Sequence, residues 1–109
     1  MSKVVELNDE NFDAEIKNAK HPVLVDFFAP WCGHCRVQNP IIEKLADEFG
    51  DKAVIAKINV DENRNIASRY FISGIPAILL FKDGKPIAQK AGVQQLDELI
   101  NLVLKHENN

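Results

Sequence analysis

Apolar residues run almost unbroken from Val23 to Phe28, and Asp26 is the only charged residue among them. A run of this kind is typical of a central β-strand that is covered on both faces. Other apolar or β-branched segments predict further strands at residues 3–7, 54–60 and 77–81. The first of these segments is short, and we expect it at an edge of the sheet.

A hairpin signal follows the strand predicted at residues 77–81. The dipeptide Asp83-Gly84 favours a two-residue turn between antiparallel strands. Residues 85–91 are therefore predicted to form the returning strand, which Gly92 ends.

Apolar residues at helical spacing predict four helices. They cover residues 12–19, residues 32–49, a short stretch from Asp61 or Asn63 to Tyr70, and a last helix from Leu96 to His106. The expected buried faces are Val37, Ile41, Leu45 and Phe49, widened by Ile42 and Ala46, in the longest helix, and Leu96, Leu99, Ile100, Val103 and Leu104 in the last.

Residues that start or stop helices support these boundaries. Asn8–Asn11 offers an N-cap for the first helix, and His21-Pro22 stops it. Pro40 lacks a backbone N–H and is expected to kink the longest helix, while Gly50 fits its C-terminal cap. Glu107–Asn109 is expected to fray.

The predicted order β-α-β-α-β-α-β-β-α defines an α/β protein. Alternating strands and helices favour parallel strand pairs in the first half, and the hairpin adds antiparallel ones, so the sheet is mixed. Helices must cover both faces to bury strands this apolar. The 109 residues suffice for a single domain, residues 1–109, and no repeat or linker divides them.

Composition excludes several classes of partner. Hydrophobic residues make up 46% and charged residues 27%, and the net charge is -3, which gives no strong attraction to nucleic acid or anionic membranes. No apolar run approaches the ~20 residues of a membrane span. The N-terminus lacks an apolar signal core, so we expect an intracellular, cytoplasmic protein, although a mature secreted chain would look the same.

The two cysteines, Cys32 and Cys35, lie at the expected start of the longest helix. A bridge across so small a loop removes little entropy from the unfolded chain, so the pair is more suited to chemistry than to structural support. The positive end of a helix and its unpaired N–H groups stabilise a thiolate, most of all on Cys32. A pKa lowered by one to two pH units corresponds to roughly 1.4 to 2.7 kcal/mol.

This places Cys32 as the exposed nucleophile and Cys35, one turn further and more buried, as the resolving thiol. A structural zinc site would need two more ligands, and no second Cys or His pair is present. The c-type haem motif needs His where this chain has Arg36. A Cys–His hydrolase with His34 stays open, although no orienting third group is evident.

At this point the chain resembles the thioredoxin family. The resemblance is carried by Trp31-Cys32-Gly33-His34-Cys35, Asp26, Pro40, Ile75-Pro76, Gly84 and Gly92, and it extends nearly end to end without insertions. It implies the thioredoxin fold, a central mixed five-stranded sheet between layers formed by four helices. It also implies reduction of protein disulfides by a monomer without a bound cofactor or metal, with thioredoxin reductase, and through it NADPH, recharging the dithiol.

His34 departs from the family pattern, in which proline usually stands at this position. Cys-Gly-His-Cys resembles the site of protein disulfide isomerase. An imidazole near Cys32 would stabilise the thiolate and the reduced state, so we expect a less reducing potential than with His34→Pro. The alternative is a solvated loop histidine without consequence, as we expect for His21 and His106.

Asp26 has two interpretations. It could reach an exposed end of the sheet, or it could be a buried carboxyl whose pKa is raised by desolvation. The resemblance favours the second and implies that Asp26 exchanges a proton with Cys35. Lys57, in the neighbouring apolar strand, is then its expected charge partner.

The resemblance also implies a substrate surface. Any X-Pro bond has only a ~5% base rate of being cis, yet the resemblance predicts a cis Ile75-Pro76 bond facing the cysteines. Backbone groups of Ile75 would bind an extended substrate, and the other members of the surface would be Trp31, Gly33, Gly74 and Gly92. Trp31 could instead serve packing alone, Phe28 is expected to be structural, and Pro30 has no interpretation.

Two other functions remain open. A more oxidising or isomerising exchanger is suggested by His34. A binding module, in which the Trp31 and Ile75 surface holds a partner without turnover, belongs to a different class.

Overall fold

The computed structural model describes residues 4–107, and Lys3, Asn108 and Asn109 of the elements predicted above lie outside this range. Its strands are β1 (Val5–Leu7), β2 (Val23–Phe28), β3 (Val54–Asn59), β4 (Ala77–Lys82) and β5 (Lys85–Ala91). Its helices are α1 (Phe12–Asn18), α2 (Gly33–Phe49), α3 (Arg64–Arg69) and α4 (Leu96–His106), with a 3₁₀ turn η1 (Gly50–Lys52) after α2. The predicted order of elements is confirmed.

The strands form one mixed sheet in the order β1-β3-β2-β4-β5. β3 pairs in parallel with β1 and β2, whereas β4 is antiparallel to β2 and to β5. β1 lies at the edge and β2 at the centre, as the sequence predicts. The hairpin between β4 and β5 turns on Asp83 and Gly84, both at positive φ.

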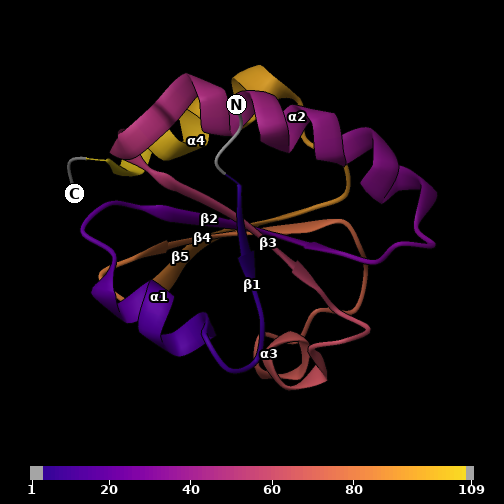
Figure 1. Ribbon diagram of the computed structural model, residues 1–109. Helices are drawn as coiled ribbons and strands as arrows, with labels where there is room; N and C mark the ends of the chain where they lie inside the picture. The colour runs from indigo at the N-terminus through magenta and orange to yellow at the C-terminus, as the bar shows by residue number, and fades with distance from the viewer. Residues whose placement is uncertain (1–3, 108–109) are drawn as a thin grey trace.

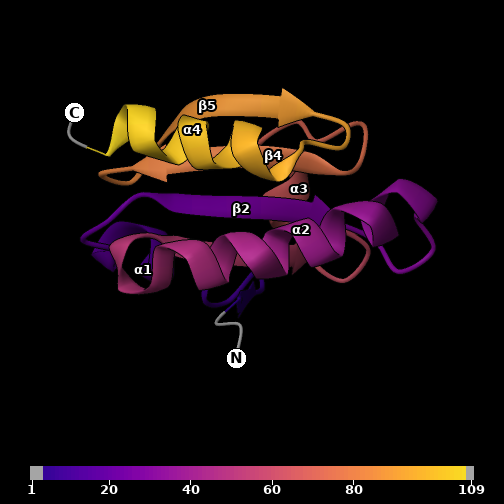
Figure 2. The ribbon, with the colours of Figure 1, turned by 90° about the horizontal axis from the view of Figure 1, so that it is seen from above.

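Helices cover both faces of the sheet. Figures 1 and 2 show α2 and α4 on one face and α1 and α3 on the other. Successive side chains of β2 point to opposite faces, so Leu24 joins the core beneath α2 and α4, whereas Val25 and Phe27 join the core beneath α1 and α3. This three-layer arrangement is the predicted thioredoxin fold.

Two residues of the predicted buried faces are exposed. Val37 of α2 is 54% exposed and Leu104 of α4 is 50% exposed. A strict four-residue repeat drifts by about 40° at each step around a helix of 3.6 residues per turn, so Val37 rotates away from the face of Leu45. The position facing the core there belongs to Gln38, which is 0% exposed.

The fold places the start of α2 at the carboxyl end of the central strand. β2 ends at Phe28, a short turn follows, and α2 begins at Gly33 with Cys32 as its N-cap residue. Pro40 lies inside α2, and Gly50 at φ 54° ends the helix as predicted. The connections before β4 and after β5 approach the same end of the sheet, because the Gly92 N–H donates to the Pro76 carbonyl oxygen at 2.9 Å.

Candidate active site

Cys32 and Cys35 form a disulfide at the N-terminus of α2, with Cα atoms 5.2 Å apart. The backbone N–H of Cys35 donates a hydrogen bond of 3.2 Å to Cys32 Sγ. Cys32 is the N-cap residue, so its sulfur occupies the place where a serine or aspartate oxygen ordinarily accepts such a bond. An acceptor in this place is stabilised further when it carries negative charge, because the helix N-terminus is positive.

The disulfide is less exposed than the sequence suggests. Cys32 is 6% exposed and Cys35 is 4% exposed, so the expectation of an openly exposed Cys32 is wrong for this oxidised form. Neighbouring apolar groups of Phe28, Val60 and Ile75 pack against the pair and cover it. Cys32 keeps the slightly larger exposure of the two, in the expected order.

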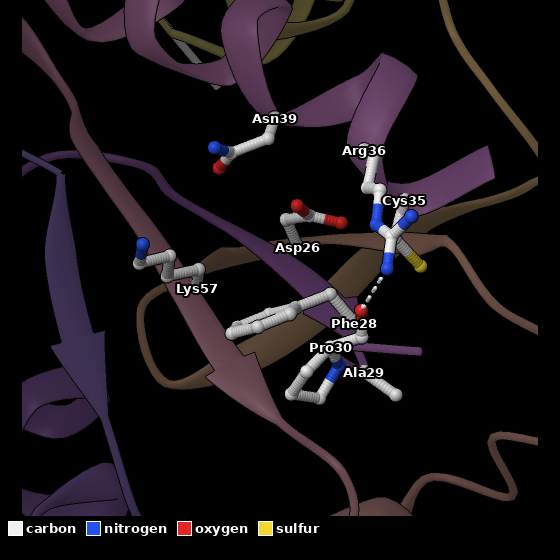
Figure 3. A pocket seen from close by; sticks show the side chains of 8 residues that line it. All are labelled: Asp26, Phe28, Ala29, Pro30, Cys35, Arg36, Asn39 and Lys57. Atoms are coloured by element: carbon white, nitrogen blue, oxygen red, sulfur yellow. Dashed lines mark hydrogen bonds between the residues drawn. The ribbon is translucent and has the colours of Figure 1, made fainter. Parts of the chain in front are cut away.

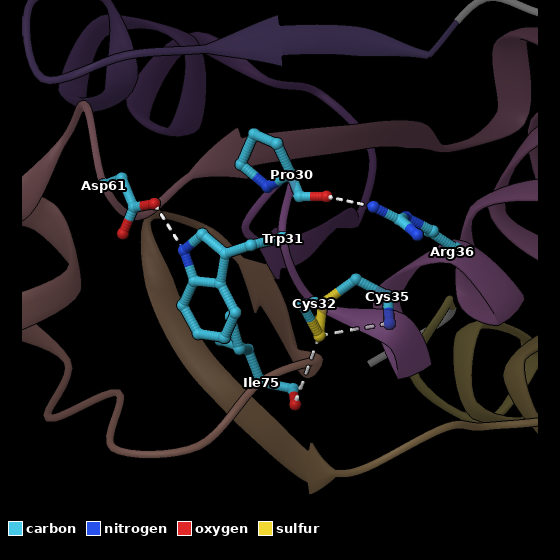
Figure 4. The surroundings of a disulfide bond; sticks show 7 residues. All are labelled: Pro30, Trp31, Cys32, Cys35, Arg36, Asp61 and Ile75. Atoms are coloured by element: carbon cyan, nitrogen blue, oxygen red, sulfur yellow. Dashed lines mark hydrogen bonds between the residues drawn. A yellow bond between two sulfur atoms is a disulfide. The ribbon is translucent and has the colours of Figure 1, made fainter.

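The Ile75-Pro76 bond is cis, as the resemblance predicts. The Ile75 carbonyl oxygen lies 3.8 Å from Cys32 Sγ (Figure 4). A sulfur in a disulfide carries no hydrogen, so this approach is a contact in the oxidised protein and becomes a donor–acceptor pair only for a Cys32 thiol. The main chain before Pro76 thus faces the sulfur of Cys32.

Trp31 lies beside the disulfide and is 67% exposed, which excludes a role confined to core packing. Its indole Nε1–H donates a 2.7 Å hydrogen bond to Asp61 Oδ2 (Figure 4). The backbone N–H of Asp61 in turn donates to Asn59 Oδ1 at 2.9 Å. The exposed ring is therefore held in one orientation by the connection between β3 and α3.

Asp26 is buried, with 1% of its surface exposed, so it does not reach an exposed end of the sheet. Within the described residues its Oδ1 has no hydrogen-bond partner. Desolvation raises the pKa of Asp26 to about 7, and the positive charge of Lys57 opposes this rise. Asp26 and Lys57 are register partners on β2 and β3. At neutral pH the carboxyl is thus able to hold or release a proton.

A pocket of about 230 Å³ opens beside Asp26 and Cys35 (Figure 3). Its lining comprises Asp26, Phe28, Ala29, Pro30, Cys35, Arg36, Asn39 and Lys57. Figure 3 shows the Asp26 carboxylate between Lys57 on one side and Arg36 and Cys35 on the other. The Arg36 guanidinium donates to the Pro30 carbonyl oxygen at 3.3 Å. Two cationic side chains, Lys57 and Arg36, thus line the pocket beside this carboxyl.

The remaining predicted site residues lie around the same end of the molecule. Gly33 and His34 occupy the exposed first turn of α2. Gly74 is exposed just before Ile75, and Gly92, at φ 80°, is exposed just after β5. Gly92 is joined to Pro76 by the backbone hydrogen bond described above.

Sequence reasoning missed several residues of this region. Asp61, Arg36 and Asn39 were not predicted to take part, and neither were Gln38 and Gln94, which are hydrogen-bonded to each other. The burial of Gln38 could have been predicted, because a buried face of α2 with 3.6 residues per turn includes this position. The contacts of Asp61 and Gln94 could not have been predicted from a local pattern, because their partners lie 30 and 56 residues away.

The described range offers little for two other kinds of site. In residues 4–107 no group of three or more His, Cys, Asp or Glu side chains is placed to hold a metal ion. Within that range, too, no helix combines the length and apolar character that a membrane crossing requires.

Comparison with known proteins agrees with the fold and the disulfide. The family model described as Thioredoxin matches residues 3–105. The chain is 45% identical over 104 residues to Thioredoxin from Chlorobaculum thiosulfatiphilum, covering 95% of this chain and 96% of that relative. It is 50% identical over 90 residues to Thioredoxin 2 from Chlorobaculum tepidum, covering 83% of each. It is 39% identical over 106 residues to Thioredoxin 1 from Synechococcus elongatus, covering 97% and 99%.

The family model covers residues 3–105, a range that contains the disulfide between Cys32 and Cys35. The protein is accordingly a thiol-disulfide oxidoreductase that reduces protein disulfides, and it belongs to the thioredoxin family.

Proposed function

We propose that reduction proceeds through a mixed disulfide on Cys32, and that Cys35 then resolves it. The observation that carries this proposal is the hydrogen bond from the Cys35 N–H to Cys32 Sγ. It singles out one of the two sulfurs for stabilisation as a thiolate, because Cys35 Sγ lies further along the helix, past its positive end. The thiolate rather than the thiol is the nucleophile in this chemistry.

In the first step the Cys32 thiolate attacks one sulfur of a substrate disulfide. A bond forms between Cys32 and that sulfur, the substrate S–S bond breaks, and the other substrate sulfur leaves as a thiolate. We assign binding of the extended substrate chain to the backbone of Ile75 and to the exposed surface of Trp31, Gly33, Gly74 and Gly92. The 3.8 Å approach of the Ile75 oxygen to Cys32 Sγ supports this assignment.

In the second step Asp26 accepts the proton of the Cys35 thiol, and Cys35 attacks Cys32. The Cys32–Cys35 bond forms, the bond between Cys32 and the substrate sulfur breaks, and that sulfur is released as a thiolate, so that the substrate gains two electrons and the protein loses two. A carboxyl with a pKa of about 7 suits this transfer, because it is only partly ionised at neutral pH. We assign Lys57 the task of limiting the rise of that pKa.

The oxidised protein then needs an external reductant. We propose thioredoxin reductase, supplied by NADPH, as the partner that returns two electrons to the disulfide, with no cofactor on the chain itself. Residues 1–109 would act as one domain and as a monomer. Action in the cytoplasm fits this cycle, because thiols are kept reduced there.

His34 favours a second candidate within the same chemistry, a more oxidising or isomerising exchanger. The sequence Cys32-Gly33-His34-Cys35 resembles the site of protein disulfide isomerase. An imidazole in the first turn of α2 would stabilise the Cys32 thiolate and hence the reduced state, which makes the disulfide a better oxidant. A stabilisation on the order of 1 kcal/mol corresponds to roughly 20 mV.

The reduction potential tests the role of His34. We expect the His34→Pro variant to be more reducing than the wild-type protein by roughly 20 mV in a glutathione redox buffer. His21→Pro is unsuitable as a control because it would alter the start of β2, so His106→Ala serves instead. A His34→Pro potential equal to or less negative than the wild-type value would contradict this role.

Cysteine variants test the proposed function itself. Reduced Cys35→Ser, incubated with insulin, should accumulate a covalent complex through Cys32, whereas the matched Cys32→Ser variant should form little. Wild-type protein should reduce insulin and release it. Complex formation mainly by the Cys32→Ser variant would reverse the assigned roles. Full biological activity of a Cys32→Ser/Cys35→Ser double variant would favour a binding module without turnover.

A further inference from the structure

The connection between β5 and α4 is fastened to α2 by a buried side chain that the reaction above does not use. Gln38 is 0% exposed, and both ends of its amide are occupied. Its Nε2 donates to the Gln94 carbonyl oxygen at 3.1 Å, and its Oε1 accepts from the Gln94 N–H at 2.7 Å. The two bonds pair with both main-chain polar groups of one residue, which also fixes the orientation of the amide.

The side chain of Gln94 continues this connection toward the active site. Its Nε2 donates to the carbonyl oxygens of Ala91 at 3.1 Å and Gly92 at 3.3 Å. The Gln94 side chain therefore links its own backbone segment, residues 91–94, by hydrogen bonds, and Gln38 joins this segment to α2. Gln38 lies about one helical turn after Cys35.

The same connection is bound to the loop that faces Cys32. The Gly92 N–H donates to the Pro76 carbonyl oxygen at 2.9 Å, and the neighbouring Ile75 carbonyl oxygen lies 3.8 Å from Cys32 Sγ. These contacts connect Cys32, the N-cap residue of α2, through the 75–76 and 92–94 segments to Gln38 within α2. Figure 2 shows the β5–α4 connection on the side of the sheet where α2 and α4 lie.

Burial makes the hydrogen bonds between Gln38 and Gln94 costly to break. A buried amide that loses its partners is strongly disfavoured, because neither water nor another side chain replaces the lost bonds. Separation of residues 91–94 from α2 would leave both polar ends of Gln38 unpaired. An apolar side chain of similar size would fill the same space without fixing the position of residues 91–94 relative to α2.

We propose that Gln38 is a positioning residue for protein substrates, acting through Gln94 to hold Gly92, a member of the proposed substrate surface, at a fixed distance from Ile75 and Cys32. The proposal rests on the proposed function, since it assumes that a substrate chain contacts both Ile75 and Gly92. A small disulfide needs only the reactive sulfur. A protein disulfide also needs the proposed substrate surface, so the two kinds of substrate should respond differently when the hydrogen bonds of Gln38 are removed.

The test compares two disulfides on the same reduced proteins. Second-order rate constants are measured with insulin and with hydroxyethyl disulfide for the wild type and for Gln38→Met, which keeps the length of the side chain and removes both hydrogen bonds. We expect the insulin rate constant to fall about threefold to tenfold, and the ratio of the insulin constant to the small-disulfide constant to fall by nearly as much. Hydrogen exchange at the Gln94 amide should accelerate in the same variant.

Two further variants keep the test decisive. Gln89→Met makes the same substitution at an exposed position of β5 and should leave the ratio unchanged. Gln94→Ala changes a partly exposed side chain, retains the bonds from Gln38 to the main chain, and should lower the ratio about twofold, even if Gln38→Met fails to fold. The inference is overturned if both disulfides slow equally, if neither variant lowers the ratio, or if Gln89→Met lowers it as much. Failure of the wild type with both disulfides would overturn the proposed function, and this inference with it.

Discussion

The two faces of β2 differ in what they bury. Toward α1 and α3 the strand presents Val23, Val25 and Phe27 to a hydrophobic core cluster. Toward α2 and α4 it presents Leu24 and then Asp26, whose Oδ1 is buried without a hydrogen-bond partner among the described residues. One face of the strand therefore adds to stability through apolar packing, whereas the other face buries a carboxyl at a cost in folding free energy.

The core beneath α1 and α3 contains an aromatic cluster, and within residues 4–107 no similar set of ring contacts lies on the other face. Phe12, Tyr70 and Phe81 have ring centroids 5.3 to 5.7 Å apart, and two of the three pairs meet edge to face. Such pairs stabilise a core beyond the area that they bury. The molecule therefore places its main stabilising aromatic contacts on one face of the sheet and the buried carboxyl on the other.

Removing the centre of the aromatic cluster should give the largest change. Phe81 is 0% exposed and contacts both other rings, so Phe81→Ala leaves a cavity and should cost about 3 to 5 kcal/mol of unfolding free energy. Denaturant unfolding of the oxidised protein measures this. The insulin rate constant of the folded fraction should stay near the wild-type value, and a loss of more than about tenfold would show that the two faces are not separate.

The pH dependence of stability should isolate the cost of Asp26. Burial raises the pKa of this carboxyl to about 7, above the ~3.9 of an unfolded chain, so the folded state binds the proton more tightly. Stability therefore falls as pH rises between these two values. For the oxidised wild type we expect a loss of about 3 kcal/mol between pH 5 and pH 8, absent in Asp26→Asn.

The matched control for this experiment is Asp47→Asn, which changes an exposed carboxyl on α2. It should keep the wild-type decline. An Asp26→Asn variant whose stability declines with pH as steeply as that of the wild type would assign the slope to other groups.

In the reduced protein, Asp26→Ala should slow resolution of the mixed disulfide more than the first attack, and equal slowing of both steps would count against proton transfer to Asp26.

The smallest effect concerns Phe71, which follows α3 beside the aromatic cluster without joining it. It is 87% exposed and its φ is 55°, a conformation that favours glycine. Phe71→Gly should relieve the steric cost of this backbone while adding entropy to the unfolded chain, for a net gain of about 0.5 to 1 kcal/mol. Thermal unfolding measures it, and a loss of 1 kcal/mol or more would show that the ring makes stabilising contacts.

The sequence predicted the parts of this molecule that depend on local patterns. Continuous apolar runs located β2 and β4, and Asp83-Gly84 located the hairpin, because strand burial and turn geometry act over a few residues. The position of Cys32 at a helix start followed from the same patterns. The cis bond before Pro76 came from family resemblance alone, since sequence base rates favour trans.

The missed features depend on residues brought together from afar. Gln38 pairs with Gln94, and Trp31 with Asp61, and no local pattern reports such partners. Val37 was misplaced because a fixed four-residue repeat does not follow a helix of 3.6 residues per turn. The covering of Cys32 was missed because Ile75 and Val60 approach it from other parts of the chain.

The most direct test is a titration of the Cys32 thiol in the reduced protein, followed by thiolate ultraviolet absorbance. The Cys35→Ser variant isolates Cys32 and keeps the backbone N–H that donates to its sulfur. We predict a pKa for Cys32 one to two pH units below the ~8.5 of free cysteine. A pKa at or above that value would show that the helix N-terminus does not stabilise the thiolate, and would contradict the assignment of Cys32 as the attacking sulfur.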